Sequence, residues 1–348
     1  MTTRMDSKLE TIRSGRYQRS DFMIADAKDA DMGSGIAGLG MLRSADGSSQ
    51  RHRTRQEFLE SIVEIIDQDV VDIMLVSASN LDLLQKRDAF RNSAIKPAIR
   101  ANDTTDCWGG VRHGTYASKP SHPFVTASIP RVMYGSAEPQ PGAPVTGTDL
   151  GLYSVTFVND LATDVAALDR FSTFRADAAR YGFKYFFEVF NPNVETGLTR
   201  EQTGEFVNDC ILRCLAGVNE PDRPLFLKIP FNGPKALEEL AGFDSTLVVG
   251  ILGGGAGTTR DTFELLHQGE KYGARLALFG RKINLAEKPL ALVSLMRQVV
   301  DGAISPEEAV KAYHGELQQT GTRPIRTLED DRQITEAVLK PAATLRVA

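Results

Sequence analysis

The chain has 348 residues, of which 42% are apolar and 24% are charged, which is the ordinary composition of a globular protein. Its 40 Lys and Arg residues against 45 Asp and Glu residues leave a net charge of −5, so the basic face of a nucleic-acid-binding protein is missing. No run approaches the roughly 18 apolar residues of a membrane-spanning helix, and residues 1–21 lack the apolar stretch of a signal peptide. We therefore expect a cytoplasmic protein that binds neither nucleic acid nor a membrane.

Short apolar runs alternate with helical patterns along most of the chain. The predicted strands are residues 22–26, 71–77, 97–102, 150–158, 183–190, 224–230, 246–252 and 275–279. Helical spacing of apolar residues marks residues 55–68, 81–92, 162–181, 199–216, 234–240, 259–272, 288–300 and a stretch that opens at Ser305. Eight strands, most of them followed by a helix, predict an α/β fold of the (β/α)8 (TIM) barrel type.

The length exceeds what such a barrel requires. A barrel needs about 250 residues, which leaves roughly 100 for additions. We assign a polar lead to residues 1–20, the barrel to residues 21–302, a long insertion loop after the third strand to residues 103–149, and a helical tail to residues 303–348. The insertion is rich in Gly, Pro, Ser and Thr and shows no clear helix. A doubly wound open sheet is the alternative fold, but no Gly-x-Gly-x-x-Gly turn follows the first strand.

A lysine and a glutamate lie within two predicted strands, where charged residues are rare. Lys228 shares a face of its strand with Phe226, and Glu188 shares a face with Phe186 and Phe190, because side chains alternate with period two. An apolar site favours the neutral amine of a lysine and the neutral acid of a glutamate. A neutral amine can form a Schiff base with a carbonyl group, and such a glutamate suits general acid–base catalysis. A buried ion pair between the two side chains is the structural alternative.

Further polar residues fall at the ends of the first and third strands. Asp26 ends the first strand, and Arg100 and Asn102 share a face at the end of the third. Barrel active sites are built at the carboxyl ends of the strands. We therefore expect these residues to meet Glu188 and Lys228 at one rim, with Asp26 as a third catalytic group and with Arg100 and Asn102 binding the substrate.

The loops after the seventh and eighth strands are typical of an anion site. Barrel phosphate sites are often built from these two loops. Glycines let backbone N–H groups approach an anion, and an arginine adds a bidentate contact, although a glycine run can also be a flexible loop. We predict a site for a phosphate, sulfonate or carboxylate group of the substrate, made by Gly253, Gly254, Gly255, Gly280 and Arg281.

Five short motifs carry a resemblance to a known family. They are Ile24-Ala-Asp26, Phe186-Phe-Glu188, Leu227-Lys-Ile-Pro230, Gly253-Gly-Gly255 and Phe279-Gly-Arg281. The sequence resembles the class I, Schiff-base aldolases of the deoxyribose-phosphate aldolase superfamily, in particular the tagatose-bisphosphate, sulfofructose-phosphate and archaeal-type fructose-bisphosphate aldolases. The resemblance implies a metal-independent lyase of carbohydrate metabolism that needs no cofactor. It implies that Lys228 forms the Schiff base, that Glu188 assists proton transfer, and that Asp26 contacts the substrate during carbon–carbon bond cleavage.

Two features depart from that family. Tagatose-type enzymes carry a further lysine on the fourth strand, whereas here that strand reads Tyr153-Ser-Val-Thr-Phe-Val158. Arg100 of the third strand is a candidate to fill that volume. The insertion at residues 103–149 has no counterpart in the resemblance either. The expected substrate is therefore a class, namely a phosphorylated or sulfonated ketose.

Two other classes of function remain open. A barrel isomerase or epimerase of a sugar phosphate would use Glu188 and Asp26 as an acid–base pair, with Lys228 as a simple charge. A non-catalytic ligand-binding protein would keep the fold and lose the chemistry. None of the five histidines has metal-ligand spacing, and we expect no metal site. We also expect a homo-oligomer, with the helix at residues 288–300 available to pack between subunits.

Overall fold

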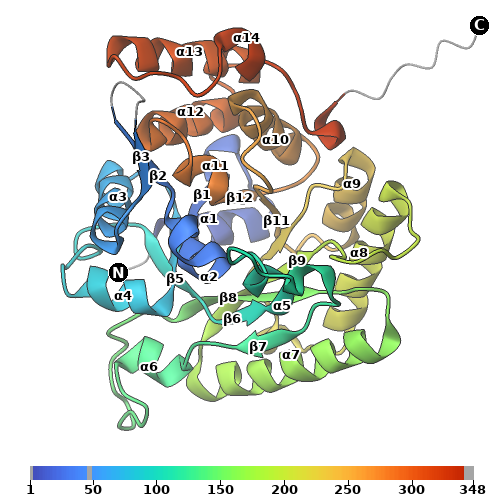
Figure 1. The fold of residues 1–348 in the computed structure, drawn as a ribbon. Helices are drawn as coiled ribbons and strands as arrows, with labels where there is room; N and C mark the ends of the chain where they lie inside the picture. The colour runs from blue at the N-terminus through green and yellow to red at the C-terminus, as the bar shows by residue number, and fades with distance from the viewer. Residues whose placement is uncertain (1–2, 45–48, 341–348) are drawn as a thin grey trace, which may run out of the picture.

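The computed structural model describes residues 3–44 and 49–340, and its core is a closed barrel of parallel strands (Figure 1). The barrel strands in chain order are β1 (Met23–Lys28), β4 (Ile73–Val76), β5 (Lys96–Arg100), β8 (Leu150–Thr156), β9 (Lys184–Phe190), β10 (Leu227–Ile229), β11 (Val249–Leu252) and β12 (Leu276–Phe279). Each pairs in parallel with the next, and β12 pairs with β1 to close the ring. The prediction of a (β/α)8 barrel is confirmed.

Helices cover the outer face of the barrel. They are α3 (Arg55–Gln68), α4 (Ala78–Gln85), α7 (Leu161–Tyr181), α8 (Arg200–Ala216), α9 (Pro234–Phe243), α10 (Thr259–Lys271), α11 (Arg281–Asn284) and α12 (Pro289–Asp301). Local sequence sets several of their starts, because Thr54, Thr199 and Thr258 each form a capping box with the residue three positions on. The helix predicted at residues 81–92 is α4, which begins three residues earlier and ends at Gln85.

The final helices of the chain lie over α12 and α10 (Figure 1). α13 (Pro306–Gln319) packs on α12, whose apolar residues Leu292, Val293 and Met296 are buried. The chain itself therefore covers these apolar residues of α12, and the homo-oligomer expected from the sequence stays a prediction. The tail continues through α14 (Leu328–Asp331) and a 3-10 turn, η5 (Ala337–Leu339). Residues 341–348 of the predicted tail lie outside the described residues.

The connection between β1 and α3 holds several short elements. They are α2 (Ala30–Ser34), a 3-10 turn, η2 (Gly35–Leu39), and an antiparallel pair of strands, β2 (Met41–Arg43) and β3 (Gln50–His52). Two further 3-10 turns, η1 (Arg19–Asp21) and η4 (Glu220–Asp222), precede β1 and β10. No helix in the described part of the chain is both long and apolar enough to cross a bilayer.

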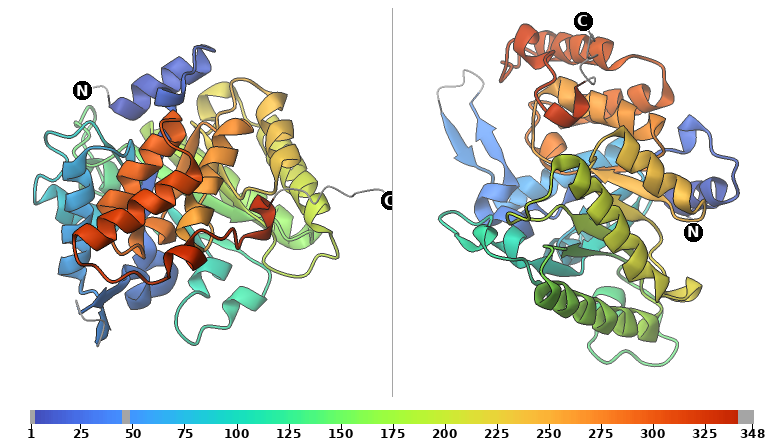
Figure 2. Two further views of the ribbon diagram at one scale, coloured as in Figure 1. Left: turned by 90° about the horizontal axis from the view of Figure 1, so that it is seen from above. Right: turned by 90° about the vertical axis from the view of Figure 1, so that its right-hand side faces the viewer.

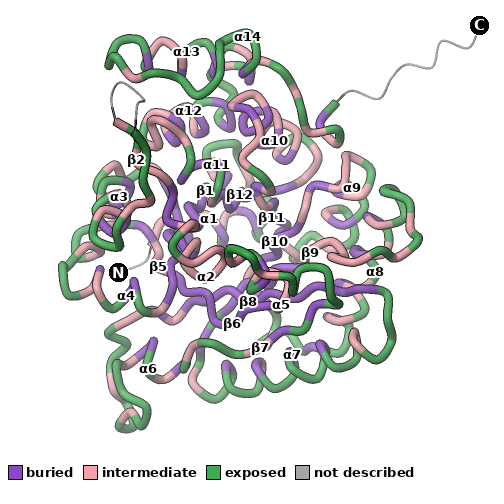
Figure 3. The backbone as a smooth tube through the Cα atoms, viewed as in Figure 1, coloured by how far each residue is buried: buried purple, intermediate pink, exposed green. Residues whose placement is uncertain are grey.

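The barrel strands are buried along most of their length (Figure 3), and their two faces belong to different apolar layers. Ala25, Phe186 and Phe226 fill the inside of the barrel, whereas Ile24 and Phe187 pack in the layer shared with the surrounding helices. Because side chains alternate along a strand, this division decides whether a strand residue faces the barrel axis or the helices.

Helix α1 (Arg4–Arg13) closes the amino-terminal end of the barrel. Its buried residues Met5, Leu9 and Ile12 join the interior apolar layer. In the right-hand view of Figure 2, α1 lies at one end of the barrel and the first part of the insertion, coloured teal, lies at the other. The lead predicted at residues 1–20 thus contains a helix that covers the bottom of the barrel, and only the opposite end is left for a site.

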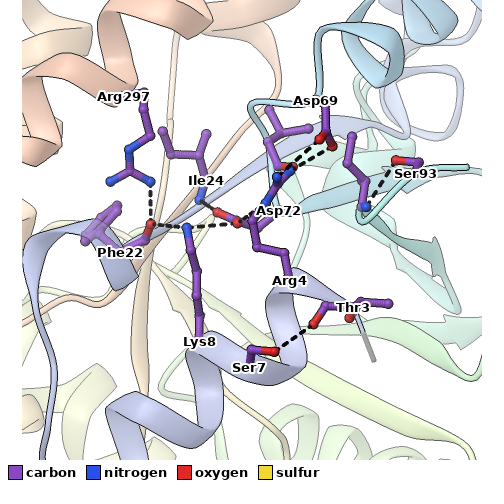
Figure 4. A network of polar contacts seen from close by, with 12 residues as sticks. Thr3, Arg4, Ser7, Lys8, Phe22, Ile24, Asp69, Asp72, Ser93 and Arg297 are labelled. Atoms are coloured by element: carbon purple, nitrogen blue, oxygen red, sulfur yellow. Dashed lines mark hydrogen bonds and ion pairs between the residues drawn. The ribbon is translucent and has the colours of Figure 1, made fainter. Parts of the chain in front are cut away.

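A buried carboxylate ties α1 to the barrel (Figure 4). Asp72 directly precedes β4 and is fully buried. Its Oδ1 lies 3.0 Å from Arg4 Nε and 2.9 Å from Lys8 Nζ. Its Oδ2 accepts the N–H of Ile24 in β1 at 2.8 Å. One side chain therefore joins α1, β1 and β4.

Replacement of Asp72 by asparagine should lower the free energy of unfolding by about 1–3 kcal/mol. The amide keeps an acceptor for the N–H of Ile24, but it removes the charge that balances Arg4 and Lys8. Burial lowers the pKa of Lys8, and the negative charge of Asp72 opposes that shift. In the variant the buried ammonium group of Lys8 therefore has no opposite charge to balance it. Urea unfolding measures the change, with Asp69→Asn at the exposed end of the same network as the control. An unchanged unfolding midpoint would show that apolar packing alone holds α1.

The insertion at residues 103–149 is folded, although its sequence shows no clear helix. It contains the antiparallel strands β6 (Asn102–Thr104) and β7 (Pro123–Val125), the helices α5 (Thr105–Trp108) and α6 (Ile129–Tyr134), and a 3-10 turn, η3 (Tyr116–Ser118). Asn193, in the loop after β9, donates hydrogen bonds to the carbonyls of Ala117 and Lys119. α5 also contacts α2, which follows β1. The insertion therefore lies against loops at the carboxyl ends of the strands.

Candidate active site

Lys228 and Glu188 face the inside of the barrel side by side. They are partners in the register of β10 and β9, and Lys228 Nζ lies 2.7 Å from Glu188 Oε1, with side chains only 9% and 2% exposed. Two residues earlier on the same strands, Phe226 and Phe186 stack inside the barrel. The buried ion pair that the sequence left open is present. The same contact lets the carboxylate take the ammonium proton and leave the neutral amine that adds to a carbonyl group.

Ser154 of β8 holds the other side of Glu188. Ser154 Oγ donates to Glu188 Oε2 at 2.6 Å, so both carboxylate oxygens are engaged. Asn102 fixes Ser154 in turn, because its side chain accepts the N–H of Ser154 at 2.7 Å and donates to the carbonyl of Ser154 at 2.8 Å. The fourth barrel strand therefore presents a hydroxyl group to the carboxylate.

Arg100 ends β5 inside the barrel and is engaged by carboxylates. Its guanidinium lies 3.2 Å from Asp29 Oδ2 and 3.0 Å from Asp103 Oδ1. Burial alone would lower the pKa of Arg100, but the neighbouring anions, Asp29 foremost, outweigh it and raise that pKa. Within the described chain Arg100 donates no hydrogen bond to Glu188 or Lys228. Arg100 still lies close enough to Glu188 to interact with its charge, and its place in the volume of a fourth-strand lysine stays a prediction.

Asp26 lies on the opposite face of β1 from this cluster. Its register partners are Phe279 of β12 and Met74 of β4, and both pack in the outer apolar layer. Asp26 is fully buried there, with its Oδ2 3.3 Å from Lys28 Nζ. The expectation that Asp26 meets the other charged residues at one rim is wrong. β1 is apolar on both of its faces before Asp26, so the sequence does not show which face points inward.

Asp29 is the carboxylate near β1 that reaches the carboxyl end of the barrel. It directly follows β1, three residues after Asp26, and it pairs with Arg100. Sequence reasoning missed it. The signal that could have found it is the pair of small residues Ala25 and Ala27, which line the interior face of β1 and suit the crowded axis of a barrel.

The insertion contributes a further acidic group to this end. Asp106 of α5 accepts a hydrogen bond from Ser121 Oγ at 2.7 Å and one from Thr156 Oγ1 of β8 at 3.2 Å. Thr156 lies two residues beyond Ser154 on β8 and so shares its inward face. No sequence pattern points to Asp106, because the insertion has neither helical nor strand periodicity to place its side chains.

The predicted anion-binding residues Gly253, Gly254, Gly255, Gly280 and Arg281 lie in the loops after β11 and β12. Gly280 has to be a glycine, because a Cβ there would lie 2.7 Å from the carbonyl oxygen of Ala27 in β1. Gly254 has a left-handed φ of 63°. The N–H groups of Gly254 and Gly255 donate to no described residue. Arg281 is exposed, and its side chain has no ion pair or hydrogen bond to any residue that the structure describes.

Metal-binding side chains do not gather at this end of the barrel. Within residues 3–44 and 49–340, no group of three or more His, Cys, Asp and Glu side chains is arranged to hold a metal ion. The groups at hand are an amine, carboxylates, hydroxyl groups and unused N–H donors. They suit acid–base and covalent chemistry on a polar, anionic small molecule.

Comparison with known proteins relates the chain to others by fold. No protein-family model matches it, and no curated protein matches its sequence. An archaeal fructose 1,6-bisphosphate aldolase superposes with a TM-score of 0.58 at 13% identity, over 84% of this chain and 99% of that one. A second structure of an archaeal fructose-1,6-bisphosphate aldolase has its catalytic Lys covalently bound to the carbinolamine intermediate of the substrate. It superposes with a TM-score of 0.58 at 13% identity, over 84% of this chain and 100% of that one.

A structural genomics target from Corynebacterium glutamicum is similar to the same extent. Its TM-score is 0.56 at 16% identity, over 86% of this chain and 93% of that one. The chain therefore has the (β/α)8 barrel fold of archaeal fructose-bisphosphate aldolases, at sequence identities that show the fold alone.

Proposed function

We propose that the protein is a class I aldolase, a lyase that cleaves or forms a carbon–carbon bond of a phosphorylated or sulfonated ketose through a Schiff base on Lys228. The observation that carries the proposal is the 2.7 Å contact between Lys228 Nζ and Glu188 Oε1 inside the barrel. The fold shared with archaeal fructose-bisphosphate aldolases supports the same class of reaction. The unused donors of Gly254, Gly255 and Arg281 suit the anionic end of such a substrate.

The reaction begins with proton transfer from Lys228 to Glu188. The neutral amine adds to the ketose carbonyl, and loss of water gives an iminium. A base removes the proton of the hydroxyl group beyond the bond to be broken. That oxygen becomes the carbonyl oxygen of the first product, and the electron pair of the broken bond moves into the iminium to form an enamine. Protonation of the enamine and addition of water release the second product and free Lys228. Glu188 touches the reacting nitrogen and is therefore the group that we assign to these proton transfers.

In this mechanism Asp29, and not Asp26, is the aspartate that contacts the substrate during carbon–carbon bond cleavage. It is the carboxylate at the end of β1 that lies beside Arg100, at a distance of 3.2 Å. We assign it to substrate hydroxyl groups, with Arg100 as the side chain that positions it. Asp26 has no role in the reaction, because it lies among residues of the outer layer.

Borohydride trapping tests the Schiff base directly. The protein is incubated with a panel of ketose phosphates and ketose sulfonates, reduced with borohydride, digested and mapped by mass spectrometry. Reduction of the iminium leaves a secondary amine, so we expect the added mass on the peptide that carries Lys228. Lys228→Met should abolish the adduct, while Lys184→Met, which removes an exposed lysine at the start of β9, should not.

Other outcomes distinguish the competing classes of function. Failure of every member of the panel to modify Lys228 contradicts the proposal. Exchange of substrate hydrogen with solvent in the absence of an adduct would indicate an isomerase or epimerase. Ligand-induced stabilisation with neither exchange nor an adduct would indicate a non-catalytic binding protein.

A further inference from the structure

The C-terminal strap, which we define as residues 320–340, runs from α13 past the amino-terminal end of α10 (Figure 1). Thr258, the N-cap of α10, donates to the carbonyl of Gln333 at 2.7 Å, and the N–H of Thr259 donates to Asp331 Oδ1 at 2.8 Å. The strap thus supplies its own carboxylate to this helix end. Its contacts lie directly beside the glycine loop, which we define as residues 253–257.

A second carboxylate binds the strap to the same helix end from the other side. Asp261 of α10 accepts hydrogen bonds from the N–H and the hydroxyl group of Thr335, at 2.8 and 2.5 Å, and from the N–H of Glu336 at 3.2 Å. Burial alone would raise the pKa of Asp261, but the hydrogen bonds from Thr258 and from the strap outweigh it and lower that pKa. The ionised carboxylate therefore fixes where the backbone of Glu336 lies.

Glu336 is in turn the link between the strap and the glycine loop. Lys282, the residue after Arg281, has a fully buried side chain whose Nζ lies 2.8 Å from Glu336 Oε1. The same Nζ donates to the carbonyl of Ala256 at 3.3 Å. Glu336 also lies against Gly257, where a Cβ would come 3.1 Å from its Oε1.

The glycine loop has no other anchor of this kind. Among the described residues, the bond from Lys282 is the only hydrogen bond that any of residues 254–257 makes. A loop of glycine and alanine has no polar side chain with which to hold itself, and glycine loses more conformational entropy on ordering than any other residue. The position of the loop therefore depends on Lys282, and the position of Lys282 depends on Glu336.

We propose that Glu336 is a positioning residue for the anionic group of the substrate. Through Lys282 it holds the glycine loop beside α11, so that the N–H groups of Gly254 and Gly255 are ordered next to Arg281 before an anion arrives. Ordering a loop in advance raises affinity, because binding no longer bears that entropic cost. This inference rests on the anion site of the proposed function, but it does not depend on the Schiff base.

The test measures anion binding in a double-mutant cycle. Glu336→Ala and Lys282→Met should each weaken the binding of inorganic phosphate about tenfold, a change of about 1.4 kcal/mol. The double variant should be no weaker than either single variant, because both remove one interaction. Glu336→Gln keeps a hydrogen-bond acceptor and should recover part of the loss. With the ketose that modifies Lys228, the loss should appear in KM more than in kcat.

Two further variants locate the effect. Arg281→Ala should abolish phosphate binding, which places the anion at these loops. Glu307→Gln breaks the pair with Arg332, which ties the same strap to α13, and it should lower stability without changing phosphate affinity.

The possible results separate the two proposals. Wild-type phosphate affinity in Glu336→Ala and Lys282→Met would overturn the role of Glu336. An equal loss of phosphate affinity in Glu307→Gln would also overturn it, because loosening of the whole strap would then explain the effect. Absence of phosphate binding by the wild-type protein would overturn it as well. A missing adduct on Lys228 together with the expected phosphate results would contradict the aldolase and leave the role of Glu336 standing.

Discussion

Glu188→Gln is expected to lower turnover by about 10²–10⁴-fold, the usual contribution of a general acid–base group. The amide has the size of the carboxylate and can still contact Ser154 and Lys228, but it cannot accept the ammonium proton. Formation of the Schiff base should therefore become slow while the adduct still maps to Lys228. Single-turnover kinetics with borohydride quenching measure both the rate and the site of modification.

The effect has to be separated from a loss of folding. Glu188 is buried and its two oxygens contact Lys228 and Ser154 at 2.7 and 2.6 Å, so the unfolding midpoint of the variant is measured beside its activity. Glu195→Gln is the matched control, because Glu195 lies exposed in the loop after the same strand, and its turnover should be that of the wild type. Wild-type turnover in a folded Glu188→Gln protein would show that another group moves the protons.

Replacement of the residues of the buried Asp26–Lys28 ion pair should have a large effect on the free energy of unfolding. Lys28→Met alone should lower the free energy of unfolding by about 3–5 kcal/mol, because it leaves a buried carboxylate without a cation. Asp26→Leu combined with Lys28→Met should be at least as stable as the wild type, since buried ion pairs do not outperform apolar packing when their hydrogen bonding is incomplete. Neither oxygen of Asp26 has a hydrogen-bond partner among the described residues. Urea unfolding of both variants measures the difference.

The stability gain of the double variant should depend on pH. Burial raises the pKa of Asp26 to about 6, against an ordinary value of 3.8, although Lys28 opposes the shift. The folded protein therefore binds this proton more tightly than the unfolded chain, and the contribution of Asp26 to stability falls as pH rises from about 4 to about 6. The double variant lacks the carboxyl group, so its advantage should grow over that interval. A constant advantage would show that Asp26 does not titrate in this way.

The same variants test which aspartate serves the active site. The Asp26→Leu/Lys28→Met protein should still form the borohydride adduct on Lys228, because the pair lies in the outer layer. Asp29→Asn should slow its formation. If the folded double variant failed to form the adduct while folded Asp29→Asn formed it at the wild-type rate, the inward orientation assigned to Asp29 and the outward orientation assigned to Asp26 would be wrong.

The main parts of the candidate site could be predicted because adjacent strands follow one another in a barrel. Glu188 and Lys228 lie in consecutive predicted strands, each among apolar neighbours, and in the structure they become register partners. Ser154 was missed since serine in a strand is unremarkable until its partner is known. Asp106 was missed because it comes from a segment without periodicity, and its contact with Thr156 joins residues 50 positions apart.

By itself the sequence determined the eight barrel strands, most of the long helices around them, the closed barrel and the strand positions of its unusual charged residues. Those properties follow from local periodicity, capping residues and the short-range order of strands. Only the tertiary structure decided which face of β1 points inward, because a strand that is apolar on both faces carries no alternation. That decision moved the carboxylate of the site from Asp26 to Asp29. The tertiary structure also brought Glu336 to Lys282, 54 residues away along the chain, by a contact that no local pattern encodes.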